Sequence, residues 1–415
     1  MKQINFDHLA CSFILPEARE AMLSFLGEYI GNPLSRHFFG EKPRKALEEA
    51  RASIAGLINA ASPEEIIFTS CGSESNNLAV KGAAIANAKK GRHIIASPIE
   101  HHSVSHPLKN LEKQDYKISW LKADEKGGID PQEAASLIKE DTILITVTSA
   151  SNEIGTLEPI KEIGRIARER GVIFHTDAVA CAGQIPLDVK ELNVDLLSLA
   201  GNVFYGPLGT GALYVRKGVR VVPQIEGGIQ ERGLRAGTHN LANLVGMGIA
   251  AKVAQEKLAE RQRYLFSLRE KLIAGVLEKV PDCFLTGERD RRLPGHASFC
   301  VKFIEGESIL LRLNMLGIAG TSGSTCSSEA LKVSSVLEAI GVDPIWAQGS
   351  VVFGLGIDNI LEDVESFLKE FPEVIQNLRM MSPLFGEDIE QFRKMKRSEE
   401  RRVGKECRSR WSPYH

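Results

Sequence analysis

A single thiol in a setting of small residues is the first feature of this sequence that could do chemistry. Residues 321–328 read Thr-Ser-Gly-Ser-Thr-Cys-Ser-Ser, so Cys326 is surrounded by seven hydroxyl or glycine residues. Such residues make poor core material and suit an exposed loop, where a thiol is accessible as a nucleophile or a ligand. We therefore predict that Cys326 is a functional thiol.

A second candidate site lies in residues 69–77, which read Thr-Ser-Cys-Gly-Ser-Glu-Ser-Asn-Asn between a predicted strand and a predicted helix. A strand that ends in small residues before a helix offers free backbone N–H groups and the positive end of the helix dipole, which suits a phosphate group. We predict that Gly72 and Ser73 form this seat and that the Ser73 hydroxyl contacts the phosphate. A serine that only caps the helix would give the same sequence, so this alternative stays open.

The elements that must position these groups alternate from about residue 65 to 215. Short β-rich runs alternate with segments whose apolar residues recur every three or four positions, which is typical of crossover units in a mostly parallel sheet. The expected strands are 66–70, 93–97, 117–122, 142–148, 172–176, 195–199 and 211–215. A long helix is expected at about 240–278, followed by a second unit with strands at 297–303 and 351–355.

This pattern predicts an α/β fold with two domains. We expect a large α/β domain with a mostly parallel seven-stranded sheet at residues 15–255 and a smaller α+β domain formed by residues 1–14 and 256–395. Residues 396–415 hold seven Lys or Arg and three Glu without an amphipathic period. This segment is expected to be a disordered or appended tail, with a basic interaction tail as the alternative.

Composition narrows the class of protein. The 415 residues are 43% hydrophobic and have a net charge of -2, which favours neither nucleic acid nor a membrane surface as a partner. No apolar stretch approaches the ~20 residues of a membrane helix, and the N-terminus lacks the apolar core of a secretory signal. We expect a cytoplasmic protein.

The seven cysteines are scattered singly, which predicts reduced thiols. For Cys71, Cys181, Cys283 and Cys300 we expect the ordinary role of a small buried hydrophobe.

Ordered motifs from about residue 5 to 384 resemble those of the cysteine desulfurases, a branch of the class V aminotransferases. Residues 69–77 are similar to the family's Thr-Ser-Gly-Ala-Thr-Glu-Ser-Asn-Asn stretch, and residues 321–328 to its Ser-x-Gly-Ser-x-Cys loop. The resemblance implies fold type I, pyridoxal phosphate (PLP) as cofactor, and transfer of sulfur from L-cysteine to Cys326 for iron–sulfur cluster assembly.

The same resemblance gives roles to four further residues. His101, in a Glu-His segment, falls where the family's histidine lies over the pyridine ring, and Asn152 where an asparagine contacts the ring oxygen or substrate carboxylate. Asp177 takes the place of the aspartate that keeps the pyridine nitrogen protonated, which makes the ring an electron sink. Thr238 corresponds to the threonine that reaches the partner subunit's phosphate, which implies a homodimer.

The chain departs from the family where the cofactor is anchored. Residues 199–211 read Leu-Ala-Gly-Asn-Val-Phe-Tyr-Gly-Pro-Leu-Gly-Thr-Gly and are similar to the loop whose lysine holds PLP as a Schiff base, but Val203 stands at the lysine. A hydrocarbon side chain cannot form that bond, so covalent attachment of PLP is not expected. Asn202 occupies the position of the family's phosphate-binding histidine, and we expect it to contact the cofactor. Further departures are Ala180, Ala200, Val352 and Ile357, of which Val352 takes the place of the arginine that clamps the substrate carboxylate.

Three hypotheses follow. The first is a degenerate desulfurase that keeps Cys326 as sulfur carrier or iron–sulfur cluster ligand and docks a scaffold or sulfur-acceptor protein. The second is a working enzyme that acts on L-cysteine and holds PLP non-covalently on Asp177, His101, Ser73 and Thr238. The third is a non-enzymatic scaffold or ligand-binding protein with an emptied apolar pocket. Zinc binding through histidines is the weakest option, because their spacing does not resemble a metal site.

Overall fold

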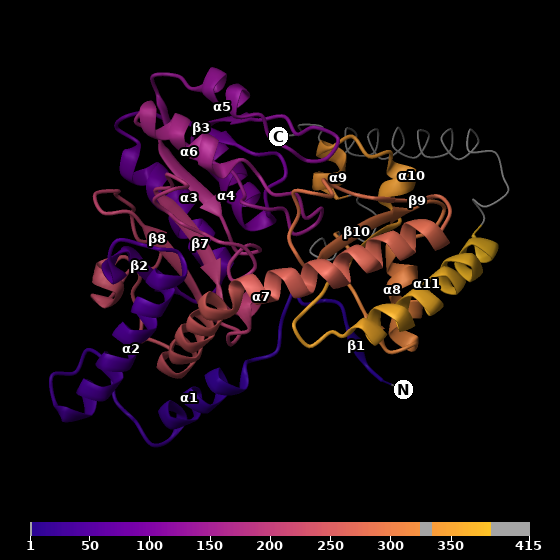
Figure 1. Ribbon diagram of the computed structural model, residues 1–415. Helices are drawn as coiled ribbons and strands as arrows, with labels where there is room; N and C mark the ends of the chain where they lie inside the picture. The colour runs from indigo at the N-terminus through magenta and orange to yellow at the C-terminus, as the bar shows by residue number, and fades with distance from the viewer. Residues whose placement is uncertain (1, 324–333, 383–415) are drawn as a thin grey trace, which may run out of the picture.

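The computed structural model describes residues 2–323 and 334–382. Cys326 and the predicted tail at 396–415 lie outside the described residues. A large α/β unit and a smaller unit lie side by side, and one long helix, α7 (Leu241–Lys279), runs from one to the other (Figure 1).

The large unit is built on a seven-stranded sheet. Its four pairs from β7 to β4 are parallel, whereas β8 runs antiparallel to both of its neighbours. All seven strands were predicted from the sequence, and the mostly parallel α/β fold is confirmed. In sheet order the strands are β2 (Ile66–Thr69), β8 (Gly211–Val215), β7 (Leu196–Ala200), β6 (Ile173–Asp177), β5 (Thr142–Thr146), β3 (His93–Ala96) and β4 (Lys117–Trp120).

Apolar side chains on both faces of this sheet explain why its inner strands are continuous hydrophobic runs. Successive residues point to opposite faces, so Ile67 packs with helix α3 while Phe68 joins the main core on the other side. The same alternation holds for Leu196 and Leu197. Helices α3 and α4 cover one face, and α2, α6 and α7 cover the other. Besides α7, the helices of this unit are α1 (Pro16–Leu26), α2 (Phe38–Leu57), α3 (Gly72–Asn87), α4 (His102–Glu112), α5 (Pro131–Leu137) and α6 (Ile160–Glu169).

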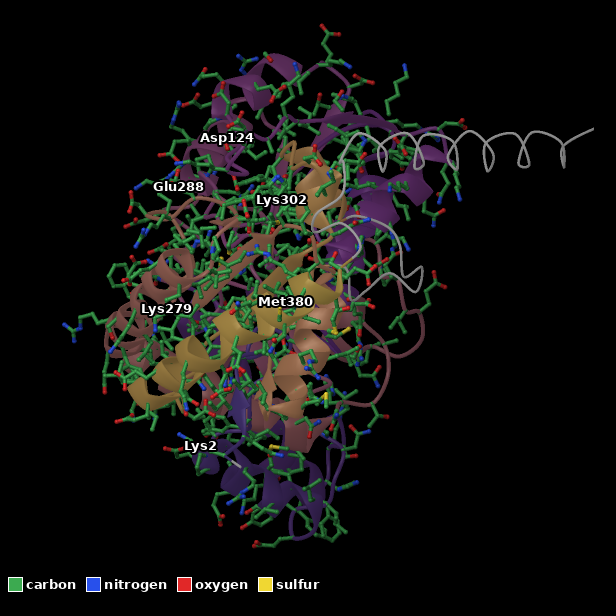
Figure 2. The ribbon with its side chains drawn as sticks, turned by 90° about the vertical axis from the view of Figure 1, so that its right-hand side faces the viewer. Lys2, Asp124, Lys279, Glu288, Lys302 and Met380 are labelled. Atoms are coloured by element: carbon green, nitrogen blue, oxygen red, sulfur yellow. The ribbon has the colours of Figure 1, made fainter. Side chains whose placement is uncertain are left out.

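The smaller unit has its own sheet and its own apolar core. The antiparallel sheet has the order β12 (Ser350–Gly354), β10 (His296–Val301) and β9 (Cys283–Leu285), and a two-residue parallel pair joins β1 (Ile4–Asn5) to β11 (Ile318–Ala319). Its helices are α8 (Gly306–Met315), α9 (Ser335–Ala339), α10 (Pro344–Ala347) and α11 (Leu361–Met381). Figure 2 shows α11 crossing this face between Lys2 and Met380, and Lys2 pairs with Asp363 at the start of that helix at 2.5 Å.

Helix α7 is 39 residues long and packs against α1 and α2 at one end and α11 at the other. It passes without a break through residues 255 and 256, so the domain boundary placed there stays a prediction. In the described part of the chain, no helix combines the length and apolar character needed to span a bilayer.

The cysteines divide into two groups. Cys181 and Cys300 are buried, as predicted, whereas Cys71 is exposed and Cys283 only half-buried. The prediction for Cys71 was wrong because β2 already ends at Thr69, which leaves Cys71 in the turn that precedes α3.

A buried ion-pair cluster ties helix α2 to the loop that leads to Thr238. Glu231 accepts hydrogen bonds from Arg51 at 2.6 and 2.9 Å, from the backbone N–H of Phe68 at 2.7 Å, and lies 2.7 Å from His239 Nε2. These donors lower the pKa of Glu231 to about 2 despite its burial. Glu231 and Arg232 adopt left-handed backbone conformations, with φ of 47° and 57°, and the cluster holds them there.

We expect Glu231→Gln to lower the free energy of unfolding by about 3 kcal/mol, because it leaves the buried Arg51 guanidinium with only the exposed Glu48 as its charge partner. Urea unfolding at pH 7 measures the loss. The control is Glu49→Gln, which removes the exposed Lys45–Glu49 pair and is expected to cost under ~0.5 kcal/mol. The difference in the free energy of unfolding between the wild type and Glu231→Gln should disappear as the pH falls from about 4.5, the ordinary glutamate pKa, to about 2. Equal losses in both variants would contradict this account.

Candidate active site

The candidate site lies at the carboxyl ends of the parallel strands, where ligands usually bind in such sheets. Asp177 is the last residue of β6 and Ala200 the last of β7. Helix α3 begins just after β2, and His101 immediately precedes α4. The strand order therefore brings together groups that lie up to about a hundred residues apart in the sequence.

A chain of hydrogen bonds joins Asp177 to His101. Asn76, on the first turns of α3, donates through Nδ2 to Asp177 Oδ2 at 2.6 Å and to Ser103 Oγ at 2.8 Å. Ser103 Oγ lies 2.7 Å from His101 Nδ1, which also accepts the Ser103 backbone N–H at 3.1 Å. Because Nδ1 is an acceptor, a neutral His101 has its proton on Nε2. Asn76 and Ser103 were given no role from the sequence, although Asn76 lies within the predicted 69–77 motif.

Burial dominates the electrostatics around Asp177. It raises the pKa of Asp177, while the Val179 N–H, the positive potential of His101 and the Asn76 hydrogen bond act in the opposite direction. Neighbouring Glu100 is fully buried, and desolvation together with the charge of Asp177 raises its pKa well above its usual range. Glu100 accepts one hydrogen bond, from the Thr148 N–H at 2.7 Å. Burial therefore raises the pKa of both carboxyl groups of the site, and that of Glu100 by more.

The start of α3 has the geometry predicted for a phosphate seat. No side chain caps the helix at Cys71, and Gly72 follows it as the first helical residue. A Cβ at Gly72 would lie 2.7 Å from Val179 Cγ2, so only glycine allows this close approach. Ser73 is exposed at the seat. The roles of Gly72 and Ser73 toward a phosphate stay predictions.

The loop at the lysine position buries an apolar side chain. Residues Gly201–Phe204 form a short 3₁₀ helix, η2, which ends at Tyr205 in a left-handed conformation with φ of 70°. Val203 is 5% exposed and belongs to the main core of the large unit. Asn202 donates through Nδ2 to the Ala10 carbonyl at 2.9 Å, so its side-chain amide is committed to the N-terminal segment.

Asn152 is held by a buried pair that the sequence did not single out. His296 Nε2 lies 3.0 Å from the Asn152 carbonyl, and Arg292 Nη1 lies 3.0 Å from His296 Nδ1. Burial and the charge of Arg292 lower the pKa of His296 to about 3, so the ring is neutral and donates through Nε2. One of three arginines in residues 289–292 and a His at the start of β10 give no sequence signal of this role.

Glu153, next to Asn152, was also missed. It accepts a short hydrogen bond from Ser334 Oγ, and a Cβ at Gly323 would fall 2.4 Å from its Oε2. Burial raises the pKa of Glu153 to about 7, against the lowering effect of Ser334. Glu153 and Val352 line one small pocket.

Two of the predicted site residues, Thr238 and Cys326, are not brought together with the residues around Asp177. Thr238 is exposed on the loop after η3 (Gln230–Gly233), consistent with a residue that would act on another subunit. Cys326 lies outside the described residues, so its predicted roles as sulfur carrier and cluster ligand stay predictions. Within residues 2–323 and 334–382 no group of three or more His, Cys, Asp or Glu side chains is arranged to hold a metal ion.

The sheet order, the buried aspartate at a strand end and the helix start beside it define the class of PLP-dependent transferases of fold type I. The chain matches the family described as Aminotransferase class-V over residues 4–367. It is 45% identical over 386 residues to cysteine desulfurase IscS of Clostridium botulinum, covering 92% of this chain and 97% of that protein. Cysteine desulfurase NifS of Azotobacter vinelandii is 40% identical, with 93% and 96% covered. A solved NifS-like protein superposes with a TM-score of 0.85 at 34% identity, covering 91% of this chain and all of that one.

The chain therefore belongs to the cysteine desulfurase family of the class V aminotransferases, as its motifs predicted. This family uses PLP and acts in sulfur transfer. The residues present fit part of that cofactor. Asp177 and His101 suit its ring and the start of α3 suits its phosphate, whereas Val203 offers no amine for a covalent bond.

Glu153 makes the stability of the site dependent on pH. Below about pH 4.5, the ordinary pKa of glutamate, the Glu153 carboxyl group is protonated in the folded and the unfolded state, so its ionisation does not affect stability there. Between that pH and about 7 only the unfolded state ionises, and stability falls as the pH rises. We expect Glu153→Gln to raise the free energy of unfolding by roughly 3 kcal/mol at pH 8 and to leave it unchanged at pH 4.

Chemical unfolding at the two pH values measures this difference. Glu162→Gln, on the exposed side of α6, removes the same charge far from burial and serves as the control. A gain from Glu153→Gln that is the same at both pH values would rule out ionisation as its cause.

Proposed function

We propose that this protein is a cysteine desulfurase-like homodimer of sulfur transfer and iron–sulfur cluster assembly that has lost the covalent PLP chemistry of its family. Cys326 is kept as sulfur carrier or cluster ligand. The observation that supports this most is Val203, a buried hydrocarbon side chain in the loop where the family has its lysine. Without an amine there, the chain can neither bind the aldehyde of PLP covalently nor move the protons of turnover at that atom.

The other departures support the same proposal. Val352, a buried strand residue of β12, replaces a charged clamp for the substrate carboxylate. Losing one charged hydrogen bond typically costs about 1.5–3 kcal/mol, which is one to two powers of ten in affinity. Ala180 and Ala200 remove further polar contacts at the same pocket. By resemblance to the family, these separated positions belong to one site, which favours loss of a function over chance.

Exposed apolar residues support the homodimer. The loop between β8 and α7, which includes Thr238, exposes Ile225 by 44% and Ile229 by 80%, and neighbouring Leu208 is 61% exposed. The N-terminal segment adds Ile30 at 69% and Phe38 at 71%. Large apolar side chains that together form one exposed patch mark a surface that a partner covers, and we propose that these segments form such a patch. The reduced cysteines among the described residues are in keeping with a cytoplasmic location.

A second candidate is a working PLP enzyme that holds the cofactor non-covalently. The observation that favours it is the intact hydrogen-bond chain from Asp177 through Asn76 and Ser103 to His101. Asp177 would pair with the pyridine nitrogen, His101 would cover the ring, and Ser73 with the partner's Thr238 would hold the phosphate. In this candidate L-cysteine is the substrate, and another amine replaces the lysine.

The two candidates differ in how they respond to PLP and borohydride. We expect the full-length protein to yield no reduced pyridoxyl-lysine on peptide mass mapping, because residue 203 has no amine. Val203→Lys is expected to gain the adduct at residue 203, and Val203→Met, which adds bulk without an amine, is the matched control. A stoichiometric adduct on the unaltered chain, or sulfide release from L-cysteine that Cys326→Ala abolishes, would instead support the working enzyme.

Persulfide transfer tests the role of Cys326. Its thiolate would attack the terminal sulfur of glutathione persulfide and release glutathione thiolate, so that no external oxidant is needed. We expect mass spectrometry to find the added sulfur at least tenfold faster on Cys326 than on Cys71. Cys71→Ala is the control, because Cys71 is exposed but has no predicted role as a sulfur carrier. Equal labelling of the two thiols would contradict a dedicated carrier.

A further inference from the structure

A pocket of about 410 Å³ lies between α3 and α4, beside the candidate site. Its volume falls within the usual range for small-molecule sites. Ser73 and His101 form its border with the candidate site, and the rest of its lining belongs to neither the cofactor seat nor the hydrogen-bond chain described above, except Ser103. The pocket is therefore a separate feature with its own chemistry.

Two helical faces supply the polar groups. Asn77 and Lys81 follow Ser73 at intervals of four residues on α3, so the three side chains lie on one face. His102, His106 and Asn110 have the same spacing on α4 and face them across the groove. This repeated spacing places side chains from both helices along the full length of the pocket.

The lining is rich in hydrogen-bond donors and has no acid. Among the described residues that line it there is no Asp or Glu, although the whole chain has a net charge of -2. Lys81 is half-buried and has no hydrogen bond or ion pair to any described residue. An ammonium group left without a counter-charge in a concave site attracts an anion from solution.

The two histidines point to the same kind of ligand. The rings of His102 and His106 are stacked, with centroids 4.9 Å apart and planes at 26°. Burial lowers the pKa of His102 by desolvating the charged ring, and the neighbouring histidines and Lys109 lower it further by repelling a positive charge there. A bound anion would relieve this repulsion. A metal ion is the poorer choice, because no third His, Cys, Asp or Glu among the described residues completes its coordination.

We propose that the groove between α3 and α4 is an anion subsite that binds the phosphate group of a small phosphorylated ligand through Lys81, His102 and His106. Asn77 and Asn110 supply neutral donors at its edges. Lys81 lies eight residues beyond Ser73, or about 12 Å along the helix axis, so the subsite is distinct from the phosphate seat at the start of α3. The proposal does not depend on whether PLP binds.

Equilibrium dialysis of the full-length protein against radiolabelled inorganic phosphate at low salt tests this subsite. We expect saturable binding that weakens at least tenfold in Lys81→Met and in His106→Gln. His106 is exposed and Lys81 is replaced by a chain of similar length, so both variants should keep the fold. Lys89→Met removes an exposed charge near the end of the same helix and is expected to leave binding unchanged.

Each other outcome would overturn the proposal. Equal weakening in Lys89→Met would mean attraction by surface charge alone. Binding abolished by Ser73→Ala but unaltered in Lys81→Met and His106→Gln would place the phosphate at the start of α3, which bears on the proposed function and not on the groove. Saturable zinc binding lost in His106→Gln, with no phosphate binding, would identify a metal site.

Discussion

The amide of Asn76 is the contact on which the candidate site depends. Through one NH₂ group it joins the first turns of α3, the end of β6 at Asp177 and the start of α4 at Ser103. The carboxylate of a strand residue, Asp177, and the hydroxyl of a helix residue, Ser103, are thereby fixed by one buried amide. This arrangement stands in the same chain as Val203, whose side chain has no amine for a covalent bond to a cofactor.

Two kinds of group surround the candidate site. One kind shapes it, such as Gly72 with its close approach to Val179 and the buried His296 that supports Asn152. Under the proposed function, the other kind has lost the ability to form or clamp covalent and ionic bonds, at Val203 and Val352. A fold can lose reactive groups at little cost in stability, since an aliphatic side chain in a buried position packs well and needs no partner. Loss of the supporting groups would instead leave buried polar atoms unpaired.

The sequence predicted the strands of the large sheet because they are apolar runs buried on both faces, a signal that is local. It predicted α7 from another local signal, a long helical pattern rich in Glu, Arg and Lys at about residues 240–278. Helices α1 and α2 were not predicted, since their exposed Leu and Phe side chains and Pro43 within α2 blur the pattern. The exposed position of Cys71 depends on where β2 ends, and the contact of His296 with Asn152 joins residues 144 apart. Such features depend on the topology and give no signal in the local sequence.

Helix α7 has a mechanical consequence. A continuous rod of 39 residues is about 58 Å long, and its two halves are embedded in different apolar cores. A tilt of about five degrees at one end displaces the other by roughly 5 Å, because displacement grows with the length of a lever. Contacts made by α1 and α2 at one extremity thus influence the position of α11 at the other, with no intervening hinge to absorb the motion.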